Sequence, residues 1–255
     1  MIDTHAHILY GVDDGPATLE DALEMLSQAE AEGITDITAT SHALHPQFHA
    51  EKEDALIRLQ NLQRAADQAG IKVKIHQGHE VRIKDDIVER FDRGELLTLA
   101  GSKYLLIELP SSGIPGNTTS VINEFLSRDI LPVIVHPERN RAIIDKPERL
   151  ARLINHGALA QVTAGSLAGK FGNDVRDTAL QLIDANLIHL YGSDAHDLRK
   201  RNFFFDKGLT YLERKKHADA VDIFLENNAR VIEHRDPVIL EPAEPAPKKK
   251  WFIFG

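Results

Sequence analysis

Two pairs of metal-capable side chains stand near opposite ends of the sequence, each with one residue between its members. His5 and His7 end the first apolar run, and Asp194 and His196 follow the run LIHLYGS. Successive side chains of a strand point to opposite faces, so residues two apart share a face. Each pair therefore directs two ligands toward one point. One isolated pair would be weak evidence, because a histidine at a strand end is often a hydrogen-bonded structural residue.

Four further β-rich runs also end in a residue that can bind a metal. ITATS leads to His42, KVKIHQGH to Glu80, YLLI to Glu108 and PVIV to His136. The alternative is that these are scattered capping or solvent-facing groups, which would not make six runs end alike. Parallel strands of a barrel build the active site at their carboxyl ends. We therefore expect all these residues to meet in one pocket.

The residue types indicate which metals this pocket would hold. Imidazole and carboxylate ligands without thiolate suit Mn, Fe or Zn, and bridging carboxylates favour a multinuclear cluster. Asp13 and Asp14 lie in the expected loop after the first strand and could add a ligand, although a turn or helix-capping role is an equal alternative for Asp14. His79 has the opposite parity to Glu80 and is expected to face away. The other histidines are expected to be surface or packing residues: His45, His49, His76, His156, His189, His217 and His234.

Seven β-rich runs alternate with helical patterns along the chain. The runs lie near 1–5, 35–41, 72–78, 103–109, 131–135, 158–163 and 187–192. The clearest helix spans 18–33, with Thr18 as N-cap and Gly33 as its stop, and similar patterns cover 51–69, 117–128, 147–155 and 173–185. The alternation predicts an α/β fold with parallel strands joined by right-handed crossovers. An open doubly wound sheet fits it too, but ligands at so many strand ends favour a barrel.

The 255 residues fit one catalytic barrel over 1–235, followed by a tail over 236–255. Four prolines in the tail are spaced too closely for a helix or a central strand. The segment Lys248–Phe254 combines lysines with aromatic residues and could touch an anionic membrane weakly, although a disordered tail or a packing contact is the favoured alternative. The run Gly165–Phe171 does not match a nucleotide-binding P-loop, and either lines the site or forms a simple turn.

Composition excludes several classes of protein. The chain has no cysteine, so it cannot form disulfides, a thiolate zinc site or the nucleophile of a cysteine-dependent phosphatase. Its net charge of -9 argues against non-specific nucleic-acid binding. Neither a signal-type apolar region nor a run of about 20 apolar residues is present, so we expect a cytoplasmic protein. The oligomeric state is not predicted.

The complete motif set resembles a known superfamily. The H-x-H start, the later histidines and glutamates, and the closing SDAH resemble the polymerase and histidinol phosphatase (PHP) domain. Within it, MIDTHAHILYGVDDGP, VIVHPERN, TAGSLAGKFG and SDAHDLRKRNF are similar to the capsule-type, metal-dependent bacterial protein-tyrosine phosphatases. The similarity spans Met1 to Ile232. It implies a distorted, TIM-like (β/α)7 barrel of the PHP fold with up to three Mn²⁺ ions.

The resemblance also implies a role for each matching residue. One ion would be held by His5, His7, Glu80 and Asp194; a second by Glu80, Glu108, His136 and His196; and a third by Asp14 and His42. Asp14 stands where other PHP members often have histidine, so the third site departs from the usual ligand pattern of the superfamily. Arg139 and Arg201 match positions expected to bind phosphate oxygens, for which guanidinium has the right geometry. The alternative for both is a solvated surface arginine.

Charge and resemblance together lead to a functional hypothesis. Three divalent ions would exceed the charge of the carboxylates Asp14, Glu80, Glu108 and Asp194 by two, which matches a phosphate monoester dianion. Such ions would also activate a water as hydroxide, without a covalent intermediate. The resemblance implies hydrolysis of phosphotyrosine in a bacterial tyrosine kinase that regulates capsule or exopolysaccharide synthesis. The alternatives are a small-molecule phosphatase of the histidinol-phosphate type and a non-catalytic metal-binding module that docks a kinase.

Overall fold

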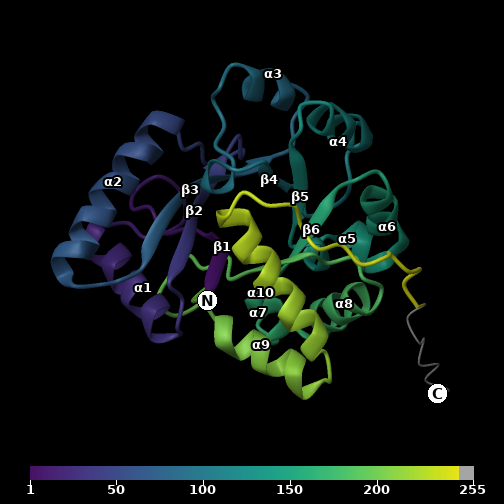
Figure 1. The fold of residues 1–255 in the computed structure, drawn as a ribbon. Coiled ribbons are helices and arrows are strands. Elements are labelled where there is room, and N and C mark those ends of the chain that lie inside the picture. Colours follow the sequence, from purple (N-terminus) through teal and green to yellow (C-terminus); the bar gives the residue numbers. More distant parts are fainter. Residues whose placement is uncertain (247–255) are drawn as a thin grey trace.

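A single parallel sheet forms the centre of the computed structural model, which describes residues 1–246 (Figure 1). The sheet follows chain order: β1 (Ile2–Ala6), β2 (Asp36–Ala43), β3 (Lys74–Arg82), β4 (Tyr104–Glu108), β5 (Leu131–Val135), β6 (Leu159–Thr163) and β7 (Leu190–Gly192). β1 and the end of β7 meet through a parallel bridge between Ala6 and Ala195. The His7 amide donates to the Ala195 carbonyl and the Asp194 amide to the His5 carbonyl, both at 2.8 Å. The sheet is therefore a nearly closed barrel, which confirms the predicted fold over the open alternative.

Helices surround this barrel on its outer side (Figure 1). They are α1 (Leu19–Ala31), α2 (Lys52–Ala69), α3 (Ile87–Asp92), α4 (Thr118–Leu126), α5 (Arg141–Asp145), α6 (Glu148–Asn155), α7 (Ala164–Leu167), α8 (Asn173–Asp184), α9 (Phe205–Arg214) and α10 (Ala218–Ile232), with 3₁₀ turns η1 (Leu99–Gly101) and η2 (Pro137–Arg139). All five predicted helical segments form within two residues of their expected ends. Thr18 caps α1 by accepting the Asp21 amide at 3.2 Å, and Gly33 has the left-handed backbone expected after it, with φ of 81°.

Two strands depart most from their predicted bounds, β3 at its end and β7 at its start. β3 continues to Arg82 because it pairs on both sides, with His42 opposite Glu80 on β2 and Glu108 opposite Arg82 on β4. β7 has only three residues, although the apolar run begins at 187. The Leu187 amide donates to the carbonyl of Leu182 at 3.0 Å, so the start of that run still belongs to the turn that ends α8.

The amino ends of the strands are closed by α10. Val231 of this helix joins a buried apolar cluster inside the barrel whose other members come from η1 and four strands: Leu99, Tyr104, Leu106, Val133, Val135, Leu159 and Leu190. The Asn228 amide side chain donates to the carbonyls of Ile2 at 2.8 Å and Tyr191 at 2.7 Å. Because this end is packed shut, the polar residues at the carboxyl ends of the strands remain to form a site.

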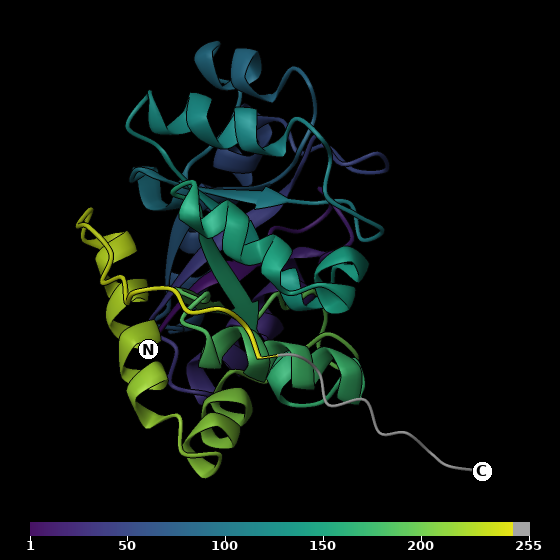
Figure 2. The same ribbon diagram turned by 90° about the vertical axis from the view of Figure 1, so that its right-hand side faces the viewer.

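The described part of the tail, 236–246, has no helix or strand and runs from α10 toward α8 (Figure 2). Val238 donates its amide to Asn227 at 2.7 Å, and Ala243 donates its amide to the carbonyl of Ala185 at 2.9 Å. The predicted lack of regular structure is confirmed for this part. The membrane contact suggested for Lys248–Phe254 concerns residues outside the described range. Over 1–246, none of the helices combines the length and apolarity that crossing a bilayer requires.

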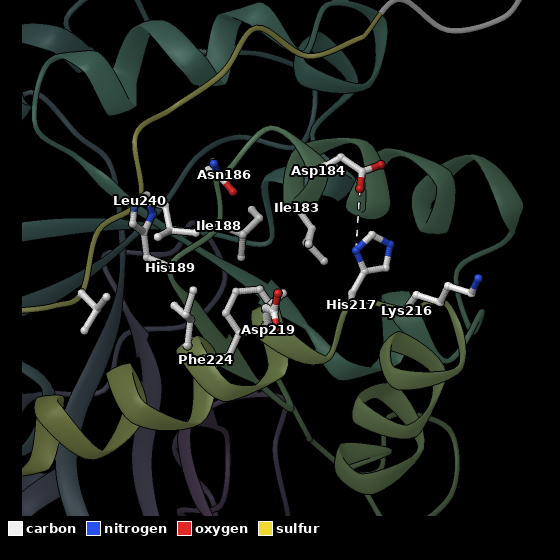
Figure 3. A pocket seen from close by; sticks show the side chains of 13 residues that line it. Ile183, Asp184, Asn186, Ile188, His189, Lys216, His217, Asp219, Phe224 and Leu240 are labelled. Atoms are coloured by element: carbon white, nitrogen blue, oxygen red, sulfur yellow. Dashed lines mark ion pairs between the residues drawn. The ribbon is translucent and has the colours of Figure 1, made fainter.

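A cavity of about 260 Å³ lies between α8, α10 and the tail, beside Ile188 and His189, which directly precede β7 (Figure 3). His189 lines it and is only 2% exposed. Its Nδ1 accepts the Ala160 amide at 3.2 Å. Burial lowers the pKa of this imidazole to about 4, so His189 is a neutral packing residue at pH 7.

The burial of His189 should make the folded state less stable at acidic pH. In the unfolded chain a histidine takes up its proton near pH 6.5, whereas folded His189 does so only near pH 4. The contribution of His189 to the free energy of unfolding is therefore complete above pH 6.5 and is lost as the pH falls toward 4. Between pH 7 and 5 the loss is about 2 kcal/mol. Urea unfolding at the two pH values should show a correspondingly smaller loss for His189→Asn, which keeps an acceptor. The exposed control His156→Asn should behave as the wild type; equal losses in all three proteins would refute this assignment.

Candidate metal centre

The carboxyl ends of the strands bring eight of the nine predicted ligands into three overlapping donor groups. The groups are His7, Asp14, His42 and His196; His5, His7, Glu80 and Asp194; and His42, Glu80 and Glu108. Within each group the ligand atoms all lie within 4.8 Å of one another. The ninth residue, His136, lies next to the cluster, with its Nε2 at 2.8 Å from Oε1 of Glu80. The grouping differs from expectation in two ways. His196 and His7 lie with Asp14 and His42, and His42 also lies with Glu80 and Glu108, where His136 and His196 were expected.

Strand geometry explains how these residues meet. His42 on β2 and Glu80 on β3 are register partners, so the pleat places them side by side. Asp194 directly follows Ser193 and has a positive φ of 55°. His136 directly follows β5 and has a positive φ of 35°. Non-glycine residues rarely adopt this backbone, and it concentrates at functional sites. The chain turns sharply at both residues while their side chains remain at the barrel mouth.

Hydrogen bonds fix the orientation of three imidazoles. Nδ1 of His5 donates to Oε1 of Gln161 at 2.7 Å, and Nδ1 of His7 donates to Oδ2 of Asp13 at 2.9 Å. Nδ1 of His196 donates to the carbonyl of Asp194 at 2.9 Å. Because these partner oxygens can only accept, each ring presents an unprotonated Nε2 when it is neutral. All three Nε2 atoms are buried and face carboxylates of the cluster, as expected of nitrogens that would bind a cation together with them. The distances are 3.4 Å to Asp194 for His5, 3.2 Å to Glu80 for His7 and 3.3 Å to Asp14 for His196.

Asp13 lies behind the cluster and belongs to none of the three donor groups. Its Oδ2 accepts from Nδ1 of His7 and, at 3.0 Å, from the His42 amide, while its Oδ1 accepts the Gly15 amide at 2.9 Å. Both oxygens are therefore occupied by donors from the protein. The sequence singled out Asp13 only as a further ligand, because the spacing of GVDDGP does not reveal which carboxylate faces the cluster.

Asp13→Asn should weaken metal binding about 10- to 100-fold, which is the usual effect of losing a carboxylate behind a metal-binding histidine. Titration of the metal-free protein with Mn²⁺ by calorimetry measures the change. Saturating Mn²⁺ should restore most activity, because the ligands themselves are intact. An affinity equal to that of the exposed control Asp222→Asn would show that Asp13 does not orient His7.

The protonation pattern of the cluster also favours cations. Burial alone would lower the pKa of His7, but the carboxylates of Asp13 and Glu80 outweigh it and hold the pKa well above its ordinary value. Burial alone would raise the pKa of Glu80, yet His5 and His42 hold it well below the usual range. Protons on imidazoles thus balance buried carboxylates when no other cation is present. Bound divalent ions would replace these protons as the positive charges beside the carboxylates.

Both predicted arginines line the same cavity, which has a volume of about 310 Å³. Nη1 of Arg201 lies 3.0 Å from Oδ2 of Asp14, and its Nη2 lies 3.2 Å from Oδ2 of Asp194. Arg139 donates to the same Asp194 oxygen and, at 3.3 Å, to Oγ1 of Thr163. Phe171 covers the Arg139 guanidinium at 4.7 Å. The glycine-rich run therefore reaches the site through Phe171.

Sequence reasoning missed two residues that contact the cluster. Arg82 lies two positions after Glu80 on β3, and its Nε is 3.1 Å from Oε2 of Glu108. Gln161 on β6 bonds His5 and donates to Oγ1 of Thr4 at 2.8 Å. For Arg82 the two-residue spacing from Glu80 was an available signal. For Gln161 no signal existed, because β6 ends in no ionisable residue. His79 faces away as expected, with its Nδ1 accepting the Leu97 amide at 3.2 Å.

Comparisons with known proteins show which chains this one resembles. The family model described as capsular polysaccharide synthesis, CpsB/CapC, matches residues 1–233. CapC of Staphylococcus aureus is 38% identical over 252 residues, which is 99% of each chain. The tyrosine-protein phosphatase YwqE of Bacillus subtilis (strain 168) is 36% identical over 261 residues, covering 100% of both.

A solved structure extends the similarity to three dimensions. It comes from a study of YwqE from Bacillus subtilis and CpsB from Streptococcus pneumoniae, described there as unique metal-dependent tyrosine phosphatases. It superposes with a TM-score of 0.94 at 33% identity, covering 97% of this chain and 100% of the other. An organophosphorus hydrolase variant from Deinococcus radiodurans shares the fold alone, with a TM-score of 0.56 at 12% identity, covering 91% of this chain and 92% of the other.

Proposed function

The chain belongs to the CpsB/CapC family of capsular polysaccharide synthesis, and from this premise we propose that it is a metal-dependent protein-tyrosine phosphatase. The observation that carries the proposal is the set of overlapping donor groups with two arginines in the same cavity. A docking module would not need buried imidazoles and carboxylates that converge on the same points. The family resemblance and the site chemistry therefore support the same activity.

The residues fit a phosphate monoester substrate. His5, His7, Asp14, His42, Glu80, Glu108, Asp194 and His196 would hold the ions, with His136 beside Glu80. Bound divalent ions would supply the Lewis acidity that activates water and neutralises phosphate charge. Arg139 and Arg201 would bind non-bridging phosphate oxygens, for which guanidinium offers paired donors. Both now contact Asp194, so they already face the cluster.

The reaction would be direct hydrolysis. The oxygen of a water forms a bond to phosphorus, the bond between phosphorus and the phenolic oxygen breaks, and a proton of that water ends on tyrosine. The arginines would hold the phosphoryl group in place, and the surrounding protein would keep the water in line with the leaving oxygen. The chain has no cysteine for a covalent alternative of the thiolate type.

Three finer parts of the proposal rest on the family relationship. Mn²⁺ is the proposed metal, in up to three positions, with Fe and Zn as alternatives that the same ligands accept. The proposed substrate is a phosphorylated bacterial tyrosine kinase of capsule or exopolysaccharide synthesis. The cytoplasmic location expected from the sequence is part of this proposal.

A comparison of two substrates tests the function. The Mn²⁺-loaded protein should release phosphate from a phosphotyrosine peptide with a higher kcat/KM than from histidinol phosphate. A preference for histidinol phosphate would replace the proposal with the small-molecule alternative. Failure to hydrolyse either substrate, with the metal shown to be bound, would favour the non-catalytic module.

A further inference from the structure

One wall of the active-site cavity is built from three nearly parallel rings. The centroids of His42 and His45 lie 4.6 Å apart with 23° between the rings. Those of His45 and Phe48 lie 5.5 Å apart at 16°, and those of His42 and Phe48 lie 5.9 Å apart at 10°. All three residues line the cavity that contains the donor groups. Each ring is therefore adjacent to the other two, and the pair His45 and Phe48, here called the aromatic shelf, lies beside the candidate metal ligand His42.

The shelf is not explained by the hydrophobic core. Phe48 is half-buried, yet it neither belongs to the described apolar core clusters nor packs against them. Its ring instead borders a cavity whose other walls carry carboxylates, imidazoles and guanidinium groups. A phenyl ring in such surroundings contributes little to folding. It is positioned to contact whatever enters the cavity.

The loop that bears the shelf is held at its base. The Ala50 amide donates to the carbonyl of His42 at 2.9 Å, which closes the loop on the end of β2. The Leu44 amide donates to Nδ1 of His49 at 3.1 Å, and the Gln47 amide to Nδ1 of His45 at 3.3 Å. These bonds fix the direction of the loop beside the cluster. The two rings are thus presented in advance, which lowers the entropic cost of contact with a ligand.

We infer that the aromatic shelf binds the phenyl ring of the substrate and makes His45 and Phe48 the residues that select aryl over alkyl phosphates. The inference rests on the proposed phosphatase function, because the phosphoryl group would have to lie at the donor groups and the arginines. The ring of a tyrosine ester then extends from the cluster toward the shelf, where offset stacking is favourable at the centroid distances seen here. A phosphoserine or phosphothreonine ester has no ring to place there.

Leu109 and Pro137 provide apolar surface elsewhere in the same cavity. They follow β4 and β5, whereas the shelf follows β2. An aryl group would therefore find apolar contacts from separate parts of the barrel mouth. Leu109 and Pro137 are themselves buried, so the apolar surface that a ligand would cover lies mainly on the half-buried shelf, and this surface favours a flat, apolar group over a short polar ester.

The test uses two phosphonates, because their P–C bond is not hydrolysed and binding is measured apart from turnover. Calorimetry of the Mn²⁺-loaded full chain should show phenylphosphonate binding about tenfold more tightly than methylphosphonate. In Phe48→Leu the affinity for phenylphosphonate should fall about tenfold, while that for methylphosphonate changes less than about twofold. Phe48→Tyr, which keeps a ring, should retain the preference.

Phe91→Leu is the matched control, since Phe91 packs against Phe125 on the outer helices and does not line the cavity. It should preserve the preference for phenylphosphonate. An equal loss of both ligands in Phe48→Leu, or an unchanged preference, would overturn the inference. The proposed function fails by a different result, which is the absence of phosphotyrosine hydrolysis by the wild type. The two failures are therefore distinguishable.

Discussion

Glu80→Gln will lower kcat/KM for a phosphotyrosine peptide by at least about 10³-fold, more than one hydrogen-bond donor to a transition state usually contributes. Glu80 belongs to two of the three donor groups, so its loss affects two candidate ion positions at once. Its Oε2 lies 3.2 Å from Nε2 of His7 and 3.0 Å from Nδ1 of His42, and its Oε1 lies 2.8 Å from Nε2 of His136. Glutamine keeps the shape but removes the charge that balances the cations. Steady-state kinetics and metal analysis of the purified variant measure the effect.

The fold should remain, because glutamine occupies almost the same volume as glutamate. Circular dichroism should give the same helix content as the wild type, and the exposed control Glu124→Gln should keep full activity and metal content. Wild-type kinetics in Glu80→Gln would contradict the placement of this residue at the centre of the cluster.

Removal of divalent ions will abolish phosphatase activity and lower the temperature of unfolding. A ligand that binds only the folded state stabilises it by about 2.7 kcal/mol at 100 times its Kd, which corresponds to about 5–10 °C for a chain of this size. Chelation followed by calorimetric scanning, with and without added Mn²⁺, measures both effects. Added Mn²⁺ should restore the lost activity and the lost stability together.

The stabilisation should also depend on pH in a defined direction. The pKa values of His5 and His7 are raised in the metal-free cluster: burial lowers them, but the nearby carboxylates raise them by more. Protons therefore compete with the metal, and Mn²⁺ should raise the unfolding temperature more at pH 8 than at pH 6. Activity that persists after metal analysis shows less than one ion per chain would contradict this account.

The candidate ligands at strand ends were predictable from the sequence. Their odd or even position along a strand decides which face they lie on, and the order of the strands decides which residues are neighbours. The H-x-H pair on β1 and the choice of Glu80 over His79 on β3 both follow from the two-residue period of a strand. The alternation of β-rich and helical runs predicted the parallel strands, and the metal-capable residues at so many strand ends favoured a barrel over an open sheet, because those residues had to meet at one end. Both ends of helix α1 were predictable because Thr18, as N-cap, and Gly33, as the left-handed residue after the helix, are signals in the local sequence.

The remaining features depend on contacts that sequence order does not reveal. His196 groups with Asp14 and His42 because β1 and the end of β7 join where the barrel closes, which brings the last ligand pair against the first loop. Asp13 and Asp14 are neighbours with different partners, and the turn between them decides which carboxylate reaches the cluster. The docking of 236–246 depends on Asn227, Asn186 and Ala185, none of which carries a recognisable docking motif.

Anomalous diffraction from crystals grown with Mn²⁺, recorded at the manganese absorption edge, is the most direct test of the central claim. The account predicts peaks within the donor groups that share His7, His42 and Glu80, each in bonding contact with the imidazole nitrogens and carboxylate oxygens described above. A map without peaks at the barrel mouth, with these side chains bonded only to one another, would contradict it.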